Sequence, residues 1–332
     1  MIKRIYSARK NHKKILSYCL SSIFIVIIVC YIFVNIQEFS KLEITNFYFI
    51  GLLFLLVVIR IFATGQIMDL SVRSLGIRLS LIESFGLANL TRLMNQVLPG
   101  KVGVIMRSVY LNKKHGLSYA GFISSFSASQ LVLFLISSFI GLLSILILKI
   151  LGTVIPVVFF YILACLVIFL LLMLVLTDKL SKRIHNERLK KILTSWQVIR
   201  KGKCNIRLLI MWSIVFTFTS ALILFSMFSA FGAEISLLVA LFFSSINIVN
   251  SFIAITPAGF GTSEGILVAL AYSVGIDIPT ALAASLLLRV VTFFSVLTIA
   301  PFFSKKLFNK SLRDFIFDNL KKSTFDNKAE NI

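Results

Sequence analysis

The sequence predicts an all-α polytopic membrane protein with about six full spans and two re-entrant hairpins tipped by proline and glycine, arranged as inverted-topology repeats. Three observations lead to this prediction. The 332 residues are 58% hydrophobic and only 14% charged, whereas soluble domains carry about 25% charged residues. Apolar runs long enough to cross a bilayer recur along the chain. Two of these runs are interrupted by proline and glycine, and a broken helix survives in lipid only where protein or water satisfies its backbone.

The positive charge lies mainly between the apolar runs. The formal net charge is +21, and 31 of the 34 lysines and arginines fall in expected cytoplasmic segments, in the first hairpin or at the inner end of the second span. Short basic loops of this kind follow the positive-inside rule and do not resemble a basic groove for nucleic acid. The pattern predicts a multi-pass protein of the plasma (inner) membrane with both termini in the cytoplasm and no nucleic-acid partner.

A basic segment, residues 1–14, precedes a single transmembrane domain over residues 15–304. The expected full spans are residues 15–36, 46–64, 118–148, 153–177, 208–231 and 279–303, with a polar connection over 65–81 and an amphipathic cytoplasmic helix over 180–199. Arg60 is expected near the inner end of the second span, where its side chain can snorkel to the headgroups. Residues 305–332 predict an amphipathic helix on the cytoplasmic face of the membrane, followed by a disordered tail.

The first hairpin is expected at about residues 81–112 and the second at about 235–274. Residues 98–103 (Leu-Pro-Gly-Lys-Val-Gly) break the first, and basic groups at both ends place its entrance in the cytoplasm. Residues 256–261 (Thr-Pro-Ala-Gly-Phe-Gly) break the second, whose acidic flanks Glu234 and Asp277 place its entrance outside. The tips share a proline and a final glycine, a short helix and a span follow each, and Gln130 aligns with Arg289. Opposite entrances make the repeats inverted, as in many transporters.

Polar residues at the two tips are the candidate site. The N-termini of the short helices that follow Gly103 and Gly261 present free N–H groups to an anion, and arginine suits a phosphate. The candidate substrate-binding or translocation residues are Pro99, Gly100, Gly103, Arg107, Pro257, Gly259, Gly261, Glu264 and Arg289, with Arg92 or Lys101 as further phosphate ligands. Four amides precede the tips and are expected to hydrogen-bond freed backbone groups or to line the path: Asn95, Gln96, Asn247 and Asn250.

Several roles for Glu264 stay open. It is a candidate to neutralise an arginine, to contact a cationic headgroup or to carry a proton that couples transport. The alternative is a structural ion pair with Arg289 that fixes the second hairpin against the last span, and this pair is compatible with transport. Arg107 has an alternative of its own, as an interfacial residue.

On these motifs the chain resembles the lysylphosphatidylglycerol synthase transmembrane-region family, also called flippase-like domain proteins, over roughly residues 10–305. The family's second motif, Pro-Gly-Gly-Leu-Gly followed by Glu, corresponds to residues 257–261 and Glu264, and the arginine of the next span to Arg289. Its first motif, Pro-Gly-x-x-Gly-Asp-x-x-Arg, maps onto Pro99, Gly100, Gly103 and Arg107. Val104 replaces the usual Asp, and residues 127–130 (Ser-Ala-Ser-Gln) replace a common Glu-Arg pair.

The resemblance implies a translocase (flippase) that moves a phospholipid or lipid-linked sugar with an anionic headgroup, in cell-envelope lipid or polysaccharide biosynthesis. The best-known member is the membrane half of the bacterial multiple peptide resistance factor. No aminoacyl-transfer domain is expected, and no nucleotide or metal motif occurs, so neither an enzyme nor a cofactor is expected. Two alternatives stay open: a membrane-embedded transferase that acts on a lipid phosphate, and a non-transporting scaffold for envelope-biosynthesis enzymes. A homo-oligomer is also left open.

Overall fold

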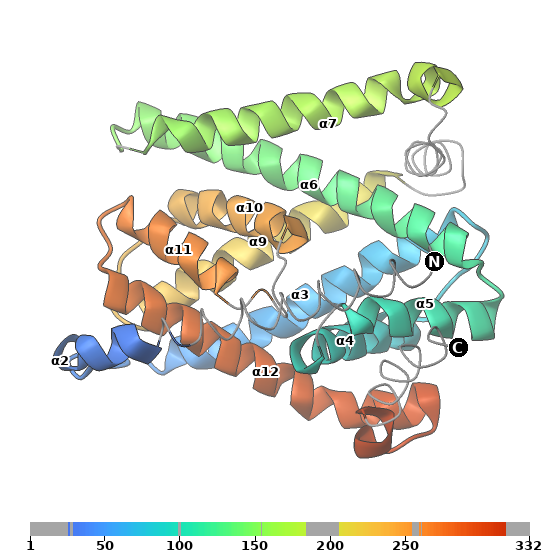
Figure 1. Ribbon diagram of the computed structural model, residues 1–332, viewed down its shortest axis with the longest axis horizontal. Helices are drawn as coiled ribbons and strands as arrows, with labels where there is room; N and C mark the ends of the chain where they lie inside the picture. Colours follow the sequence, from blue (N-terminus) through green and yellow to red (C-terminus); the bar gives the residue numbers. More distant parts are fainter. Residues whose placement is uncertain are drawn as a thin grey trace, which may run out of the picture.

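The computed structural model describes residue 26 and residues 29–98, 101–153, 155–183, 206–253, 259 and 261–316. The chain is helical throughout this part, apart from short turns, and it holds no strand there (Figure 1). The helices are α2 (Ile36–Phe39), α3 (Tyr48–Arg73), α4 (Leu81–Val97), α5 (Val102–His115), α6 (Tyr119–Ile150), α7 (Val157–Arg183), α9 (Ile206–Ser229), α10 (Leu237–Ile253), α11 (Thr262–Tyr272) and α12 (Ile278–Phe308).

Four helices are long and apolar enough to cross a bilayer. They are α3, α6, α9 and α12, with 26, 32, 24 and 31 residues, where about 20 residues suffice. α7 carries a shorter apolar stretch over Val157–Leu172, and most of the expected first span, residues 15–36, lies outside the described residues. The all-α membrane fold is therefore confirmed, while the number of spans stays a prediction.

α3 is longer than the sequence suggested, and the expected polar connection over residues 65–81 is wrong. The helix continues to Arg73 because the buried carboxylate of Asp69 has partners there. Its Oδ2 pairs with Arg73 Nη2 at 2.6 Å, and its Oδ1 accepts a hydrogen bond from the backbone N–H of Leu79 at 2.9 Å. Arg60 consequently lies at the middle of α3, about 18 Å of helix from Tyr48 and still farther from Arg73. The expectation that Arg60 lies near the inner end of its helix is therefore wrong, while its snorkelling to the headgroups stays a prediction.

Two groups of four helices, α3–α6 and α9–α12, pack in equivalent ways. When α3, α4, α5 and α6 are replaced in order by α9, α10, α11 and α12, and the reverse, the same pairs of helices are in contact. The first helices of the two groups, α3 and α9, lie against each other, and the exchange leaves this contact the same. α4 packs on α3 and on α12, and α10 packs on α9 and on α6. α5 packs on α4 and α6, and α11 packs on α10 and α12. Each group of four therefore places its second helix against the last helix of the other group (Figure 1).

The chain turns back on itself after α12. Asn309 ends the helix in the left-handed conformation, with φ at +52°, and a short helix follows at residues 312–316. Phe315 in this helix is only 2% exposed, and its ring lies 4.7 Å from that of Phe308. The start of the tail thus packs on the protein. The remainder of the expected C-terminal amphipathic helix lies outside the described residues, as does most of the helix expected at 180–199.

Candidate functional site

The first tip is closed by a bond between α4 and α5. Pro99 and Gly100 lie outside the described residues, but the residues on either side of them are close together. The side-chain Oδ1 of Asn95 accepts a hydrogen bond from the backbone N–H of Gly103 at 2.9 Å. A Cβ at Gly103 would lie 2.1 Å from the backbone oxygen of Thr91, so this approach requires glycine. The prediction that an amide before the tip satisfies freed backbone is confirmed for Asn95.

The second tip is tied to α12 through Glu264. Pro257 lies outside the described residues, whereas Gly259 and Gly261 adopt left-handed backbone conformations with φ at +69° and +81°. Glu264 is 3% exposed, and its Oε2 accepts a hydrogen bond from the Gly261 N–H at 2.8 Å. Its Oε1 accepts a hydrogen bond from Nε of Arg289 and forms an ion pair with it. The ion pair that the sequence offered as one alternative for Glu264 is therefore present.

Arg107 contacts aromatic rings of α6 and does not contact the Glu264–Arg289 pair. Its side chain is 4% exposed, and its guanidinium carbon lies 5.3 Å and 5.0 Å from the ring centroids of Phe122 and Phe126 on α6. Cation–π contacts of this kind stabilise a charge that aromatic rings shield from water. Within the described part of the chain Arg107 forms no ion pair, and its buried Nε has no hydrogen-bond partner. Arg107 is thus a buried residue that α6 covers, and its interfacial alternative stays open.

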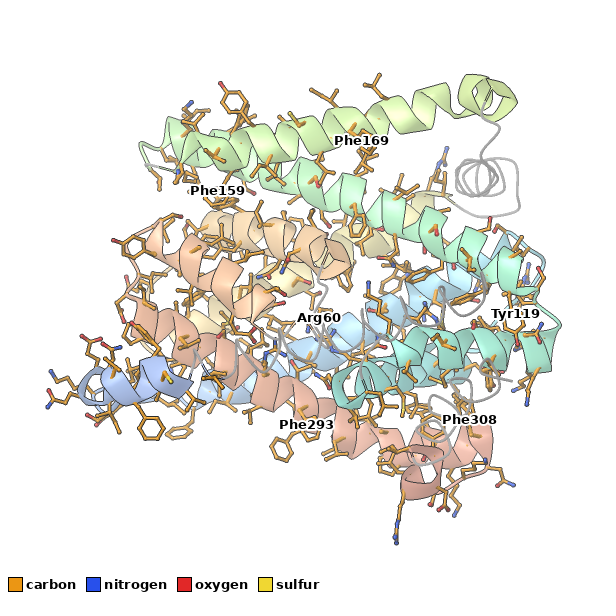
Figure 2. The ribbon with its side chains drawn as sticks, in the orientation of Figure 1. Arg60, Tyr119, Phe159, Phe169, Phe293 and Phe308 are labelled. Carbon is orange, nitrogen blue, oxygen red and sulfur yellow. The ribbon has the colours of Figure 1, made fainter. Side chains whose placement is uncertain are left out.

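Three arginines from three helices come together in the structure, and we call Arg60, Arg92 and Arg289 the arginine cluster. The charges of Arg60 and Arg92 are close enough to repel each other, as are those of Arg92 and Arg289. Their helices, α3, α4 and α12, all pack on one another. Figure 2 shows Arg60 on α3 near the middle of the molecule. The Nε atoms of Arg60 and Arg92 are buried without a hydrogen-bond partner among the described residues.

The sequence did not predict this cluster as a unit. The sequence predicts Arg92 as a phosphate ligand, but it ends the second span at residue 64 and so places Arg60 near the end of that span. The signal that could have found it is a charged residue with apolar residues on both sides, since an ionisable side chain inside a membrane helix is rarely without a role.

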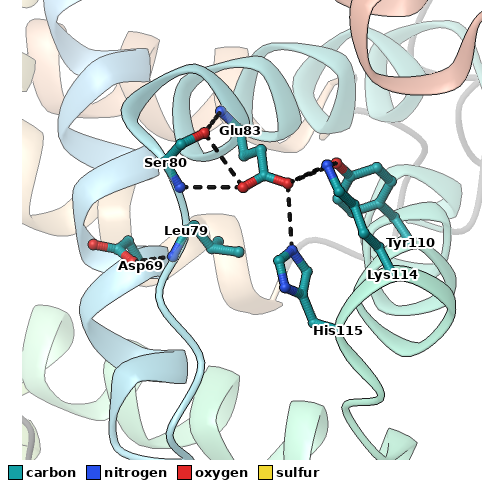
Figure 3. A network of polar contacts seen from close by, with 7 residues as sticks. All are labelled: Asp69, Leu79, Ser80, Glu83, Tyr110, Lys114 and His115. Atoms are coloured by element: carbon teal, nitrogen blue, oxygen red, sulfur yellow. Dashed lines mark hydrogen bonds and ion pairs between the residues drawn. The ribbon is translucent and has the colours of Figure 1, made fainter.

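A second polar network closes the base of the α4–α5 pair (Figure 3). Glu83 Oε1 accepts hydrogen bonds from Lys114 Nζ at 2.6 Å and from Tyr110 Oη at 3.0 Å, and it lies 3.3 Å from His115 Nε2. Its Oε2 accepts a hydrogen bond from the Ser80 N–H at 3.1 Å, which completes a capping box at the start of α4. The network joins the first turn of α4 to the last turn of α5.

These contacts stabilise the ionised form of the Glu83 carboxylate. Burial by itself raises the pKa of Glu83, but the hydrogen bonds from Lys114, from the Ser80 backbone and from Tyr110 outweigh it and bring the pKa to about 2. The same hydrogen bonds, from Glu83 first and Tyr110 second, raise the pKa of Lys114. The ion pair is therefore charged throughout the physiological pH range. The sequence showed Glu83 only as one of several polar residues at the start of the first hairpin.

The comparison with known proteins agrees with the motifs. The family model described as "Lysylphosphatidylglycerol synthase TM region" matches residues 16–300. This range includes both tips, the Glu264–Arg289 ion pair and the arginine cluster. No curated protein matches the chain. The match covers most of the chain and confirms the resemblance, so the protein belongs to the lysylphosphatidylglycerol synthase transmembrane-region family.

Proposed function

We propose that this protein is a translocase (flippase) of the plasma membrane that moves a phospholipid or a lipid-linked sugar with an anionic headgroup. The observation that carries the proposal is the exchange symmetry of the packing, in which α4 lies on α12 and α10 lies on α6. Transporters with inverted repeats place broken helices where their two halves meet, and one half rocks against the other to open the path to each side. The two tips and their cross-packed helices support such a mechanism for this chain.

The preference for an anionic headgroup follows from the charges inside the helical body. Arg60, Arg92 and Arg289 bring three positive charges together, and Glu264 brings one negative charge to the same place. A lipid phosphate that passes through the protein needs positive partners, because an unshielded charge in the bilayer costs several kcal/mol. Arginine provides them with a planar group that binds phosphate through two hydrogen bonds at once.

The transferase alternative is less well supported by the geometry. A transferase of this kind needs a carboxylate that is available as a general base or acid. Glu264 is the buried carboxylate beside the second tip, and both of its oxygens are already engaged, by Gly261 and by Arg289. The scaffold alternative makes no demand on this pair.

Reconstitution separates the three functions. The full-length protein is placed in vesicles that contain a fluorescent anionic phospholipid, and the label in the outer leaflet is quenched with time. Wild type is expected to give lipid exchange above that of empty vesicles, and Arg289→Ala is expected to reduce this exchange. Lys149→Ala is the matched control, because Lys149 is exposed. Exchange equal to that of empty vesicles would exclude a translocase of the lipids tested and favour the scaffold. A lipid product of changed mass would favour the transferase.

A further inference from the structure

The arginine cluster has more positive charge than its described surroundings neutralise. Glu264 uses one oxygen for Arg289 and the other for the Gly261 N–H. Arg60 and Arg92 form no ion pair within the described residues, and their Nε atoms are buried without a partner there. Among the described residues, three guanidinium groups and one carboxylate give this junction of α3, α4 and α12 an excess of two positive charges.

The segments at the two tips do not alter this balance. Residues 99–100 are Pro-Gly, residues 254–258 are Ala-Ile-Thr-Pro-Ala, and residue 260 is Phe. Their side chains are not ionisable, so they bring no carboxylate. Arg60, Arg92 and Arg289 are only partly exposed, and like charges held close together in such surroundings repel each other. Such an arrangement is stable when an anion of matching charge joins it.

We propose that Arg60, Arg92 and Arg289 form a binding site for a lipid phosphate that carries two negative charges, either a phosphomonoester or a diphosphate. This inference rests on the proposed translocase function and specifies its substrate. The site's excess of two positive charges matches such a headgroup better than a phosphodiester, which carries a single negative charge. Glu264 holds Arg289 through Nε and so positions it, while the guanidinium groups of Arg60 and Arg92 supply charge-assisted hydrogen bonds to the phosphate. Arg107 is not part of the site, because Phe122 and Phe126 lie over its guanidinium group.

Binding to the full-length protein in detergent tests the charge rule. The probes are phosphatidic acid, which has a phosphomonoester, phosphatidylglycerol, which has a phosphodiester, and inorganic phosphate. The second ionisation of a phosphomonoester occurs near pH 6, so phosphatidic acid is mostly doubly charged at about pH 8 and singly charged at about pH 5. Phosphatidic acid is expected to bind more tightly than phosphatidylglycerol at the higher pH, and to lose this advantage at the lower pH. Equal affinity of the two lipids at both pH values would overturn the proposal.

Variants locate the site. Arg60→Gln and Arg92→Gln are each expected to weaken phosphatidic acid binding by about ten- to a hundredfold, since a hydrogen bond to a charged group contributes that much. Arg92→Lys keeps the charge and is expected to recover part of the loss. Arg78→Gln is the matched control, because Arg78 is exposed in the connection between α3 and α4. Wild-type affinity in the Arg60 and Arg92 variants would overturn the assignment, provided that each variant elutes as a folded protein in size-exclusion chromatography.

Three further outcomes test the lipid site and distinguish its failure from that of the proposed function. Inorganic phosphate that competes as well as phosphatidic acid does, at equal concentration, would assign the cluster to free phosphate and overturn the lipid site. Normal lipid exchange by Arg60→Gln and Arg92→Gln in vesicles would refute the site and leave the translocase standing. Tight, arginine-dependent binding of phosphatidic acid by a protein that exchanges no lipid would refute the translocase and support the site.

Discussion

The Glu264–Arg289 ion pair makes a prediction about stability that its geometry allows us to work through. Glu264→Ala removes a carboxylate that is 3% exposed and leaves both the Arg289 guanidinium and the Gly261 N–H without this acceptor. Removing one partner of a buried ion pair typically lowers the free energy of unfolding by about 3–5 kcal/mol. Glu264→Gln keeps an oxygen for the Gly261 N–H, so its loss is expected to be smaller, at about 1–3 kcal/mol.

The assay is equilibrium unfolding of the purified protein in mixed detergent micelles, followed by circular dichroism. The double variant Glu264→Gln/Arg289→Gln removes both charges together. Its loss of unfolding free energy is expected to be about 0.5–3 kcal/mol smaller than the sum of the losses of the two single variants, because contacting residues are coupled. Losses that add within about 0.3–0.5 kcal/mol would refute the view that the two charges stabilise each other. Asp314→Asn, at an exposed carboxylate that accepts a hydrogen bond from the Ser311 hydroxyl, serves as the control for loss of a charge.

Three further predictions follow from local geometry. Gly103→Ala is expected to lower the melting temperature, because its Cβ would lie 2.1 Å from the backbone oxygen of Thr91, whereas Gly265→Ala meets no atom within 4 Å and is expected to leave it equal or higher. The pKa of Glu83 is depressed from 4.5 to about 2, so its stabilising effect is complete above about pH 4.5 and is lost as the pH falls towards 2. The stability difference between wild type and Glu83→Gln, measured by unfolding from pH 3 to 6, is therefore expected to shrink at the acid end, and a difference independent of pH would contradict this. In a background without native cysteines, Lys113→Cys and Tyr272→Cys, both at exposed positions, are expected to label from opposite faces of the membrane, and labelling from one face would exclude inverted hairpins.

Much of the fold could be predicted from the sequence because lipid leaves the backbone few choices. A chain in the bilayer must satisfy its own hydrogen bonds, so long apolar runs become helices. α9, α10 and α11 begin and end within a few residues of the expected ranges, and the breaks at the two tips fall where proline and glycine occur. α3 was placed less well, because the polar residues at its inner end indicated a loop. In the folded protein Asp69 and Arg73 neutralise each other there, and that contact extends the helix.

The candidate site could be predicted only in part. Glu264 and Arg289 were both selected, and their ion pair was one of the alternatives considered, because a carboxylate and an arginine in neighbouring membrane helices favour each other. The base of the first hairpin was missed. Glu83 and Lys114 are 31 positions apart, and only the antiparallel packing of α4 on α5 brings them within 2.6 Å.

The sequence by itself determined that this is a helical membrane protein, where its helices break and to which family it belongs, because hydropathy and the motif residues are local properties of the chain. The tertiary structure decided which charges meet. Arg60 joins Arg92 and Arg289 only because α3, α4 and α12 pack on one another, and Arg107 is excluded from them because α6 places two phenylalanine rings over it. Each of these contacts depends on how helices distant in sequence are rotated and packed against each other, and no pattern within a single helix specifies that.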